Sequence, residues 1–209
     1  MIAARAIARH PAASMRRIAL TGGIATGKTY VRRRLEALGL PAIDADAVVH
    51  ELLGPGPAAS RVAGRFGKAF LDAAGGIDRR ALGHLVFSDQ SARADLEAIL
   101  HPLVYERIAR WMTGLQAAGA AAALADIPLL FETGHEGDFD VVVVAACDPE
   151  EQVRRVMARD KLDEAAARDR LAAQWPIARK AAAADHVIQT GGTFEETDRQ
   201  VDALYRLLA

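Results

Sequence analysis

A glycine-rich run that ends in a lysine and a threonine is the part of this sequence best suited to chemistry. It spans Gly22–Thr29 and reads GGIATGKT, so four residues separate Gly22 from Gly27, Lys28 and Thr29. Glycine permits backbone conformations in which successive N–H groups surround an anion, and a helix that follows adds its positive end. In such a P-loop the lysine reaches the β- and γ-phosphates of a nucleotide and the hydroxyl can ligate Mg²⁺. The run therefore predicts a site for ATP and Mg²⁺, with Gly22, Gly23, Ala25, Thr26, Gly27, Lys28, Thr29 and Tyr30 as the binding residues.

Three aspartates follow apolar segments that we expect to be strands. Asp44 and Asp46 lie in the sequence IDAD, at the end of a short segment. Ligands of open α/β sheets bind at the carboxyl ends of the strands, where a carboxylate can orient a hydroxyl and take its proton. Period-two spacing places both side chains on one side if the strand continues, whereas one of the two would cap the next helix if it does not. Asp126 ends another apolar run and is a candidate to hold Mg²⁺, directly or through water.

Basic side chains supply further candidates. Arg155 and Arg159 are four residues apart, so they share one face of a predicted helix, and a guanidinium fork suits phosphate oxygens. Most arginines on helix surfaces have no specific role, so this pattern alone does not decide between phosphate binding and an ordinary exposed position. His101 precedes Pro102 inside a helical stretch, where we expect the proline to end or kink the helix and a lone histidine to be structural.

Apolar strand-like runs alternate with helical patterns along the chain, which favours a parallel sheet. The expected strands are Arg17–Thr21, Pro41–Asp44, Ala120–Ile127, Asp140–Ala146 and His186–Gln189. The alanine-rich third run would be a helix by propensity, and we assign it as a strand because a kinase sheet needs one there. Helix starts are expected at Asp148, as a cap, and at Thr193, which forms a capping box with Glu196.

Two helical stretches are inserted into this alternation: the first is too long for a simple crossover, and the second is rich in arginine. The fold class is therefore α/β: a P-loop core with a mostly parallel five-stranded sheet flanked by helices, plus two helical insertions. The expected boundaries are 16–46, 116–149 and 185–209 for the core, 47–115 for the first insertion and 150–184 for the second. Residues 1–15 are expected to be a disordered extension; the early arginines fit a transit peptide, and Met15 fits a downstream start codon.

Composition excludes several classes of partner. The 26 basic residues nearly balance the 27 acidic ones, which argues against a nucleic-acid-binding module. Apolar runs such as Val141–Ala146 are far shorter than the ~20 residues of a membrane span. Cys147 is the only cysteine, so no disulfide can form within the chain, and a cytoplasmic location fits. We expect a monomer or a small homo-oligomer.

The ordered set of motifs resembles the dephospho-CoA kinase family, over nearly the whole chain from Arg16 onward. Any one motif besides the P-loop would be unspecific, whereas their order and spacing are specific. The motifs are GGIATGKT, IDAD, Arg79-Arg80-Ala81-Leu82, Leu100-His101-Pro102-Leu103, Asp126–Glu132 (DIPLLFE), Arg155–Asp160 (RVMARD) and Leu171–Gln174 (LAAQ).

The resemblance implies a kinase that phosphorylates the ribose 3′-hydroxyl of dephospho-CoA with ATP, giving coenzyme A. Asp46 takes the family's catalytic aspartate position, and Arg159 takes that of the lid arginine that contacts phosphate during transfer. With Lys28 they form the expected catalytic set. Arg80 and His101 join Asp46 and Arg159 as expected substrate-binding residues. The resemblance also implies that the first insertion, 47–115, binds the acceptor and that the second, 150–184, is a small helical lid that closes over ATP.

Two departures from the family pattern concern the nucleotide contacts. Tyr30 stands where the family commonly has a second threonine, and Gln189-Thr190-Gly191-Gly192 stands where an asparagine-containing turn often lies beside the adenine.

Two other functions use parts of the same pattern. Another P-loop kinase, of the nucleoside, nucleotide or gluconate type, would share Lys28, Asp46 and Arg159. A nucleotide-dependent switch without catalysis would have neither the carboxylate nor a closing lid.

Overall fold

The computed structural model describes residues 15–208. The expected disordered extension therefore lies outside the described residues, apart from Met15. That residue does not belong to such a tail, because its side chain is buried at the start of the first strand.

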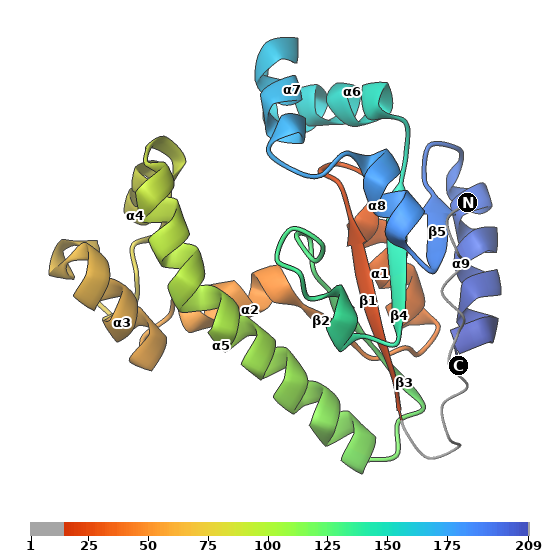
Figure 1. The fold of residues 1–209 in the computed structure, drawn as a ribbon, viewed down its shortest axis with the longest axis horizontal. Helices are drawn as coiled ribbons and strands as arrows, with labels where there is room; N and C mark the ends of the chain where they lie inside the picture. Colours follow the sequence, from red (N-terminus) through yellow and green to blue (C-terminus); the bar gives the residue numbers. More distant parts are fainter. Residues whose placement is uncertain (1–14, 209) are drawn as a thin grey trace. The chain divides into compact units, whose positions relative to one another are not determined.

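A five-stranded sheet forms the centre of the part of the molecule that contains the P-loop (Figure 1). Its strands are β1 (Arg16–Gly22), β2 (Ala42–Asp44), β3 (Ala122–Asp126), β4 (Val141–Ala146) and β5 (His186–Gln189). They lie in the order β2-β3-β1-β4-β5, and the pairs β1–β3, β1–β4 and β4–β5 are parallel. The predicted α/β class and sheet are confirmed. Because the central strands are parallel, Gly22 and Asp126 both reach the carboxyl edge, where β1 and β3 end.

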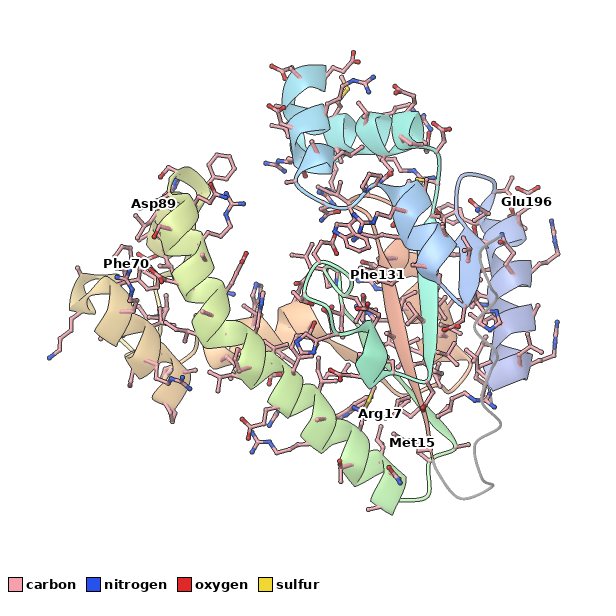
Figure 2. The ribbon with its side chains drawn as sticks, viewed as in Figure 1. Met15, Arg17, Phe70, Asp89, Phe131 and Glu196 are labelled. Carbon is pink, nitrogen blue, oxygen red and sulfur yellow. The ribbon has the colours of Figure 1, made fainter. Side chains whose placement is uncertain are left out.

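One face of the sheet packs against α1 (Lys28–Ala37) and α9 (Phe194–Leu208). Apolar side chains recur on one side of each helix, and alternate residues of each strand meet them. Glu196 lies on the first turn of α9 (Figure 2), where its carboxylate accepts the Thr193 N–H at 2.9 Å and completes the predicted capping box. The buried cluster comprises Ile18, Leu20, Val31, Leu35, Leu40, Ala122, Leu124, Val141, Val143, Ala145, Ile188, Val201, Leu204 and Leu208.

The alanine-rich segment is a strand, as the sheet required. All five residues of β3 are buried, and the strand pairs in parallel with β1. Ala123 and Ala125 are fully buried, so small side chains suit this position between neighbouring layers. Packing and ladder hydrogen bonds outweigh the few tenths of a kcal/mol per residue by which alanine prefers a helix.

Three helices lie between β4 and β5: α6 (Pro149–Asp160), α7 (Glu164–Ala172) and α8 (Ile177–Ala183). Asp148 caps α6 by accepting the Glu150 N–H at 2.8 Å. A small apolar cluster joins Val153, Val156 and Ala167 to Ile24 and Ala25 of the P-loop. The segment expected to be a lid therefore packs on the nucleotide loop and is part of the same compact unit as the sheet.

The second compact unit is helical and covers Ile43–Thr113. It contains α2 (Ala45–Leu52), α3 (Pro57–Phe66), the short 3₁₀ turn η1 (Lys68–Phe70), α4 (Arg79–Ser88) and most of α5 (Gln90–Ala117). Its own core consists of Leu53, Ala59, Val62, Ala63, Ile77, Leu82 and Leu100. The first unit takes in the described residues up to Ala42 and those from Gly114 onward, including a second 3₁₀ turn, η2 (Glu136–Asp138).

Pro102 does not end the helix that contains it. α5 continues for 28 residues through this position. A proline removes one ladder hydrogen bond, and in a helix this long the turns on both sides, which bury Leu100 and Val104, keep the helix continuous. Within residues 15–208 no helix is long and apolar enough to cross a membrane.

Candidate active site

The P-loop has the backbone geometry that the glycine pattern predicts. It joins the end of β1 to α1, and Gly27 has a φ of 78° at the helix start. A side chain at Gly22 has no room, since a Cβ there would lie 2.6 Å from Thr26 Oγ1 and 2.7 Å from Ala145 O. Ala25 also has a positive φ of 58°, which is unusual for a residue with a side chain. The loop thus holds a conformation in which its N–H groups can face an anion.

Lys28 and Asp126 form an ion pair at the carboxyl edge of the sheet. Asp126 is 1% exposed, and its other oxygen, Oδ2, accepts Arg32 Nε at 3.2 Å. Arg32 in turn donates to Glu36 at 2.9 Å. Two cations therefore alternate with two carboxylates along one face of α1. The buried carboxylate of Asp126 therefore has two cationic partners, and either one remains if the other is removed.

The donors at this edge fit a Mg²⁺ ion that arrives with a nucleotide. Mg²⁺ prefers hard oxygen ligands and is commonly held by one or two protein groups together with phosphates and water. Asp126 offers a buried carboxylate, and Thr29 offers a hydroxyl on the first turn of α1. Residues 15–208 contain no cluster of three or more His, Cys, Asp or Glu that could hold a metal alone. An ion shared with phosphate needs no such cluster.

The outer side of the loop is held by side chains of α6, of the segment between α7 and α8, and of the turn after β5. Gln152 Nε2 donates to Ile24 O at 2.7 Å, and Ile24 N donates to Gln174 Oε1 at 2.9 Å. Thr190, in the turn after β5, donates its hydroxyl to Thr26 O at 2.5 Å. The same side chain is the nearest neighbour of Gly27, at 3.4 Å from an added Cβ. The turn that departs from the family pattern thus supports the loop backbone.

The arginines of α6 differ in their surroundings. Arg155 donates to Thr190 O at 2.8 Å and to Ala25 O at 3.4 Å, so it touches the loop and the turn after β5. Arg159 instead forms a two-pronged pair with Asp160, at 2.8 and 2.9 Å. That hydrogen bond raises the pKa of the Arg159 guanidinium and lowers the pKa of the Asp160 carboxyl. The structure thus brings Arg155 to the loop and pairs Arg159 with its own neighbour.

Tyr30 turns toward α9. Its hydroxyl donates to Asp198 at 2.8 Å, and its ring packs on Phe194 with 4.8 Å between centroids. The hydrogen bond to Asp198 raises the pKa of the phenol. The side chain therefore connects α1 to α9. The backbone N–H of Tyr30 donates to Gly27 O at 2.9 Å, in the first turn of α1.

The remaining candidates lie in the helical unit. Asp44 is the cap of α2, because its carboxylate accepts the Asp46 N–H at 2.9 Å. The strand ends at Asp44, so the placement of both aspartates on one strand face is wrong, and the capping alternative holds for Asp44. Asp46 is exposed in the first turn of α2. Arg80 is exposed on the first turn of α4, and His101 is half-buried on α5.

Comparison with known proteins identifies the family. The family model of dephospho-CoA kinase matches residues 16–196. The chain belongs to the dephospho-CoA kinase family. The predicted resemblance is confirmed, and it covers both compact units.

Individual members of the family agree with this assignment. The dephospho-CoA kinase of Geobacillus kaustophilus is 43% identical over 190 residues, which is 90% of this chain and 94% of that protein. The dephospho-CoA kinase of Geobacter sulfurreducens is 44% identical over 189 residues, with 90% and 96% covered. A solved dephospho-CoA kinase from Campylobacter jejuni superposes with a TM-score of 0.66 at 28% identity, over 93% of this chain and 98% of that one. Protein TT1252 from Thermus thermophilus gives 0.70 at 33% identity, over 94% and 99%.

Several residues of the site escaped the sequence analysis. Arg32, Gln152, Glu132 and Lys180 all contact the P-loop or the groups around Asp126. Glu132 ends a quoted family motif, which was the one available signal. Lys180 lies among alanines in a helical stretch, a pattern typical of an exposed lysine. These contacts join residues that are 43 to 158 positions apart, so they leave no trace in local spacing.

Proposed function

We propose that this protein transfers the γ-phosphoryl group of ATP to the ribose 3′-hydroxyl of dephospho-CoA, giving coenzyme A and ADP in the last step of coenzyme A synthesis. Membership of the dephospho-CoA kinase family supports the reaction, and the P-loop of the sheet unit supports the phosphate donor. The observation that carries the proposal is the pair that Lys28 forms with the buried Asp126 at the end of a loop of this geometry.

The loop and Lys28 bind and orient the phosphates. Phosphoryl transfer depends mainly on positioning and on stabilisation of charge on the transferring group. Lys28 must leave Asp126 to reach the β- and γ-phosphates, and Arg32 then remains as the partner that keeps Asp126 ionised and oriented. Thr29 and Asp126 would hold Mg²⁺, directly or through water, and the ion would neutralise phosphate charge. These metal roles are part of the proposal.

Asp46 acts on the acceptor. Its exposed carboxylate would accept the proton of the ribose 3′-hydroxyl as the oxygen attacks phosphorus. Arg159 would exchange Asp160 for a phosphate oxygen, and little stability is lost in this exchange because solvent screens ion pairs near the surface. Arg80 and His101, also in the helical unit, are proposed to contact the acceptor.

ADP release from ATP and Mg²⁺, with dephospho-CoA as sole acceptor, tests the reaction. Mass spectrometry of the product should show one added phosphoryl group, and fragmentation should place it on the ribose 3′-oxygen. A panel with nucleosides, nucleotides and gluconate separates this proposal from that of another P-loop kinase. Turnover of one of these in preference to dephospho-CoA would refute the proposed acceptor.

Location and assembly are proposals of the same kind. We expect the enzyme in the cytoplasm, where ATP and a reduced Cys147 are compatible with its chemistry. We expect a monomer or a small homo-oligomer, which sedimentation analysis would establish.

A further inference from the structure

A lysine is completely buried beside the P-loop. Lys180, on α8, is 0% exposed and has three acceptors around its ammonium group. Its Nζ lies 3.1 Å from Gly22 O, 3.1 Å from Pro128 O and 2.8 Å from Glu132 Oε1. An ammonium has three N–H donors, so each donor has one partner. Burial of a lysine is rare and costly unless its charge is met in this way.

The three acceptors belong to the parts of the molecule that form the nucleotide site. Gly22 is the first residue of the P-loop, and Pro128 and Glu132 follow Asp126 at the end of β3. Thr21 also donates its hydroxyl to Pro128 O, at 3.1 Å. Lys180 therefore joins the loop, the segment after Asp126 and the last helix before β5 through one charged group.

Residues at the start of α8 extend this connection. Trp175 donates its N–H to Glu132 Oε1 at 2.9 Å, and its ring stacks on Phe131, with 5.8 Å between centroids. Figure 2 shows Phe131 in the sheet unit, close to α8. Arg179 covers the ring of Trp175 at 3.3 Å. The other oxygen of Glu132, Oε2, is buried and has no hydrogen-bond partner among residues 15–208, so the ammonium is the main compensation for this carboxylate.

Holding the Gly22 carbonyl fixes the first peptide plane of the loop. In a trans peptide the C=O and the following N–H point in opposite directions. With the Gly22 oxygen held by Lys180, the Gly23 N–H is directed away from the ammonium. Gly23 belongs to the turn that wraps the phosphates, so the orientation of this N–H matters for anion binding.

We propose that Lys180 is a positioning residue for ATP: its ammonium fixes the Gly22–Gly23 peptide and the Pro128 carbonyl, and so aligns the P-loop with the segment that carries Asp126. This inference rests on the proposed function of the P-loop. Lys180 itself does not touch the reacting atoms. Burial lowers the pKa of the ammonium, the hydrogen bond that the ammonium donates to Glu132 raises it, and the nearby charge of Lys28 lowers it further.

A double variant separates this role from that of a mere structural ion pair. Lys180→Met with Glu132→Gln removes both charges together, so neither is left buried alone. We expect the variant to fold with a melting temperature within about 10 °C of the wild type, since a buried pair replaced as a unit is often near neutral. Its affinity for a non-hydrolysable ATP analogue, measured by calorimetry, should weaken by about 10- to 100-fold, the range for a lost hydrogen bond to a charged group.

The steady-state constants supply a second readout. The KM for ATP should rise in parallel with the dissociation constant, while the KM for dephospho-CoA stays unchanged. Arg179→Ala is the matched control, because it is the next residue on α8 and touches Trp175 but not the loop. We expect its ATP affinity to equal that of the wild type. A second pair, Lys180→Leu with Glu132→Met, repeats the test with different packing.

Three results would overturn the inference. The first is wild-type ATP affinity in either folded double variant. The second is an equal rise in both KM values, which would indicate a general loosening of the fold. The third is failure of both double variants to fold, which would make the ammonium a requirement for folding and not for positioning. A wild-type enzyme that binds ATP but forms no ADP with dephospho-CoA would refute the proposed reaction and leave this inference standing.

Discussion

Lys28 pairs with the Asp126 carboxylate, and this pair determines how the removal of Lys28 should affect the fold and the rate. In Lys28→Ala, Asp126 keeps Arg32 as a partner, so the fold should survive. Phosphoryl transfer, however, loses a preorganised cation at the phosphates, which typically costs on the order of 100- to 1,000-fold in rate. We expect kcat to fall by that factor with an unchanged far-UV circular dichroism spectrum. A variant with turnover close to that of the wild type would refute the P-loop assignment.

Asp44 and Asp46 make a matched pair two residues apart. Asp44→Asn should be almost silent in stability and activity, since asparagine caps a helix about as well as aspartate. Asp46→Asn keeps the shape and removes the proposed base, so kcat should fall by about 100- to 10,000-fold with little change in the KM for ATP. Steady-state kinetics and melting temperatures of both variants test this. If only Asp44→Asn is crippled, the residue assignment is wrong; if neither loses more than a few-fold, the carboxylate mechanism should be dropped.

Site residues could be predicted from the sequence where their contacts are local, and could not where the contacts join distant parts of the chain. The P-loop could be read from spacing alone because its conformation is local, and Gly22 and Gly27 occupy positions that a side chain would disturb. The assignment of Asp44 as a cap needed the end of β2, which the sequence left open. The three acceptors around the Lys180 ammonium belong to residues 22, 128 and 132, so this contact can be seen only in the folded structure.

At the scale of elements, the helices α6 and α7 carry arginines that are already paired. Arg159 and Arg170 share Asp160, and Arg168 bridges Glu150 and Glu164. If these helices close over ATP as proposed, Arg159 must exchange its carboxylate partner for a phosphate oxygen.

This exchange leads to a prediction for Arg159. Arg159→Ala should lower kcat by about 100-fold if the side chain meets the transferring phosphate, as for the loss of one electrostatic contact. Asp160→Asn frees the same arginine and should change kcat by less than about fivefold, because ion pairs that solvent screens contribute little. Arg170→Ala is the control, since it loses the same carboxylate. Equal effects of Arg159→Ala and Arg170→Ala would assign both residues to the stability of these helices.

The elements themselves were largely predictable. Strong patterns gave β1, β4 and β5, and capping signals gave the starts of α6 and α9. Pro102 does not end its helix, because the cost of one proline is distributed over 28 residues. The alanines of β3 had the wrong propensity, and only the expectation that a kinase sheet has a strand there decided their assignment; the strand lies between β1 and β2.

At the scale of the whole molecule, the chain leaves the sheet unit at Ala42 and re-enters it at Gly114. The expected insertion, 47–115, is close to the helical unit, whereas the expected lid, 150–184, belongs to the sheet unit. Each unit has its own apolar core. Because local opening depends on local packing, separate cores allow a ligand of one unit to slow opening in that unit and leave the other unit unchanged.

Hydrogen exchange with one ligand at a time tests this division. A non-hydrolysable ATP analogue at about 100 times its dissociation constant stabilises the state that binds it by about 2.7 kcal/mol, or about 100-fold in protection where exchange requires that state to open. We expect slowing at 22–32, 126–132 and 150–184, and little change across 43–113. Dephospho-CoA alone should slow exchange within 43–113, including the segments around Asp46, Arg80 and His101. The Lys28→Ala variant is the control, since it should lose the ATP effect and keep the acceptor effect. Slowing of 150–184 by dephospho-CoA alone, with 43–113 unchanged, would place the acceptor on the sheet unit and contradict the proposed role of the helical one.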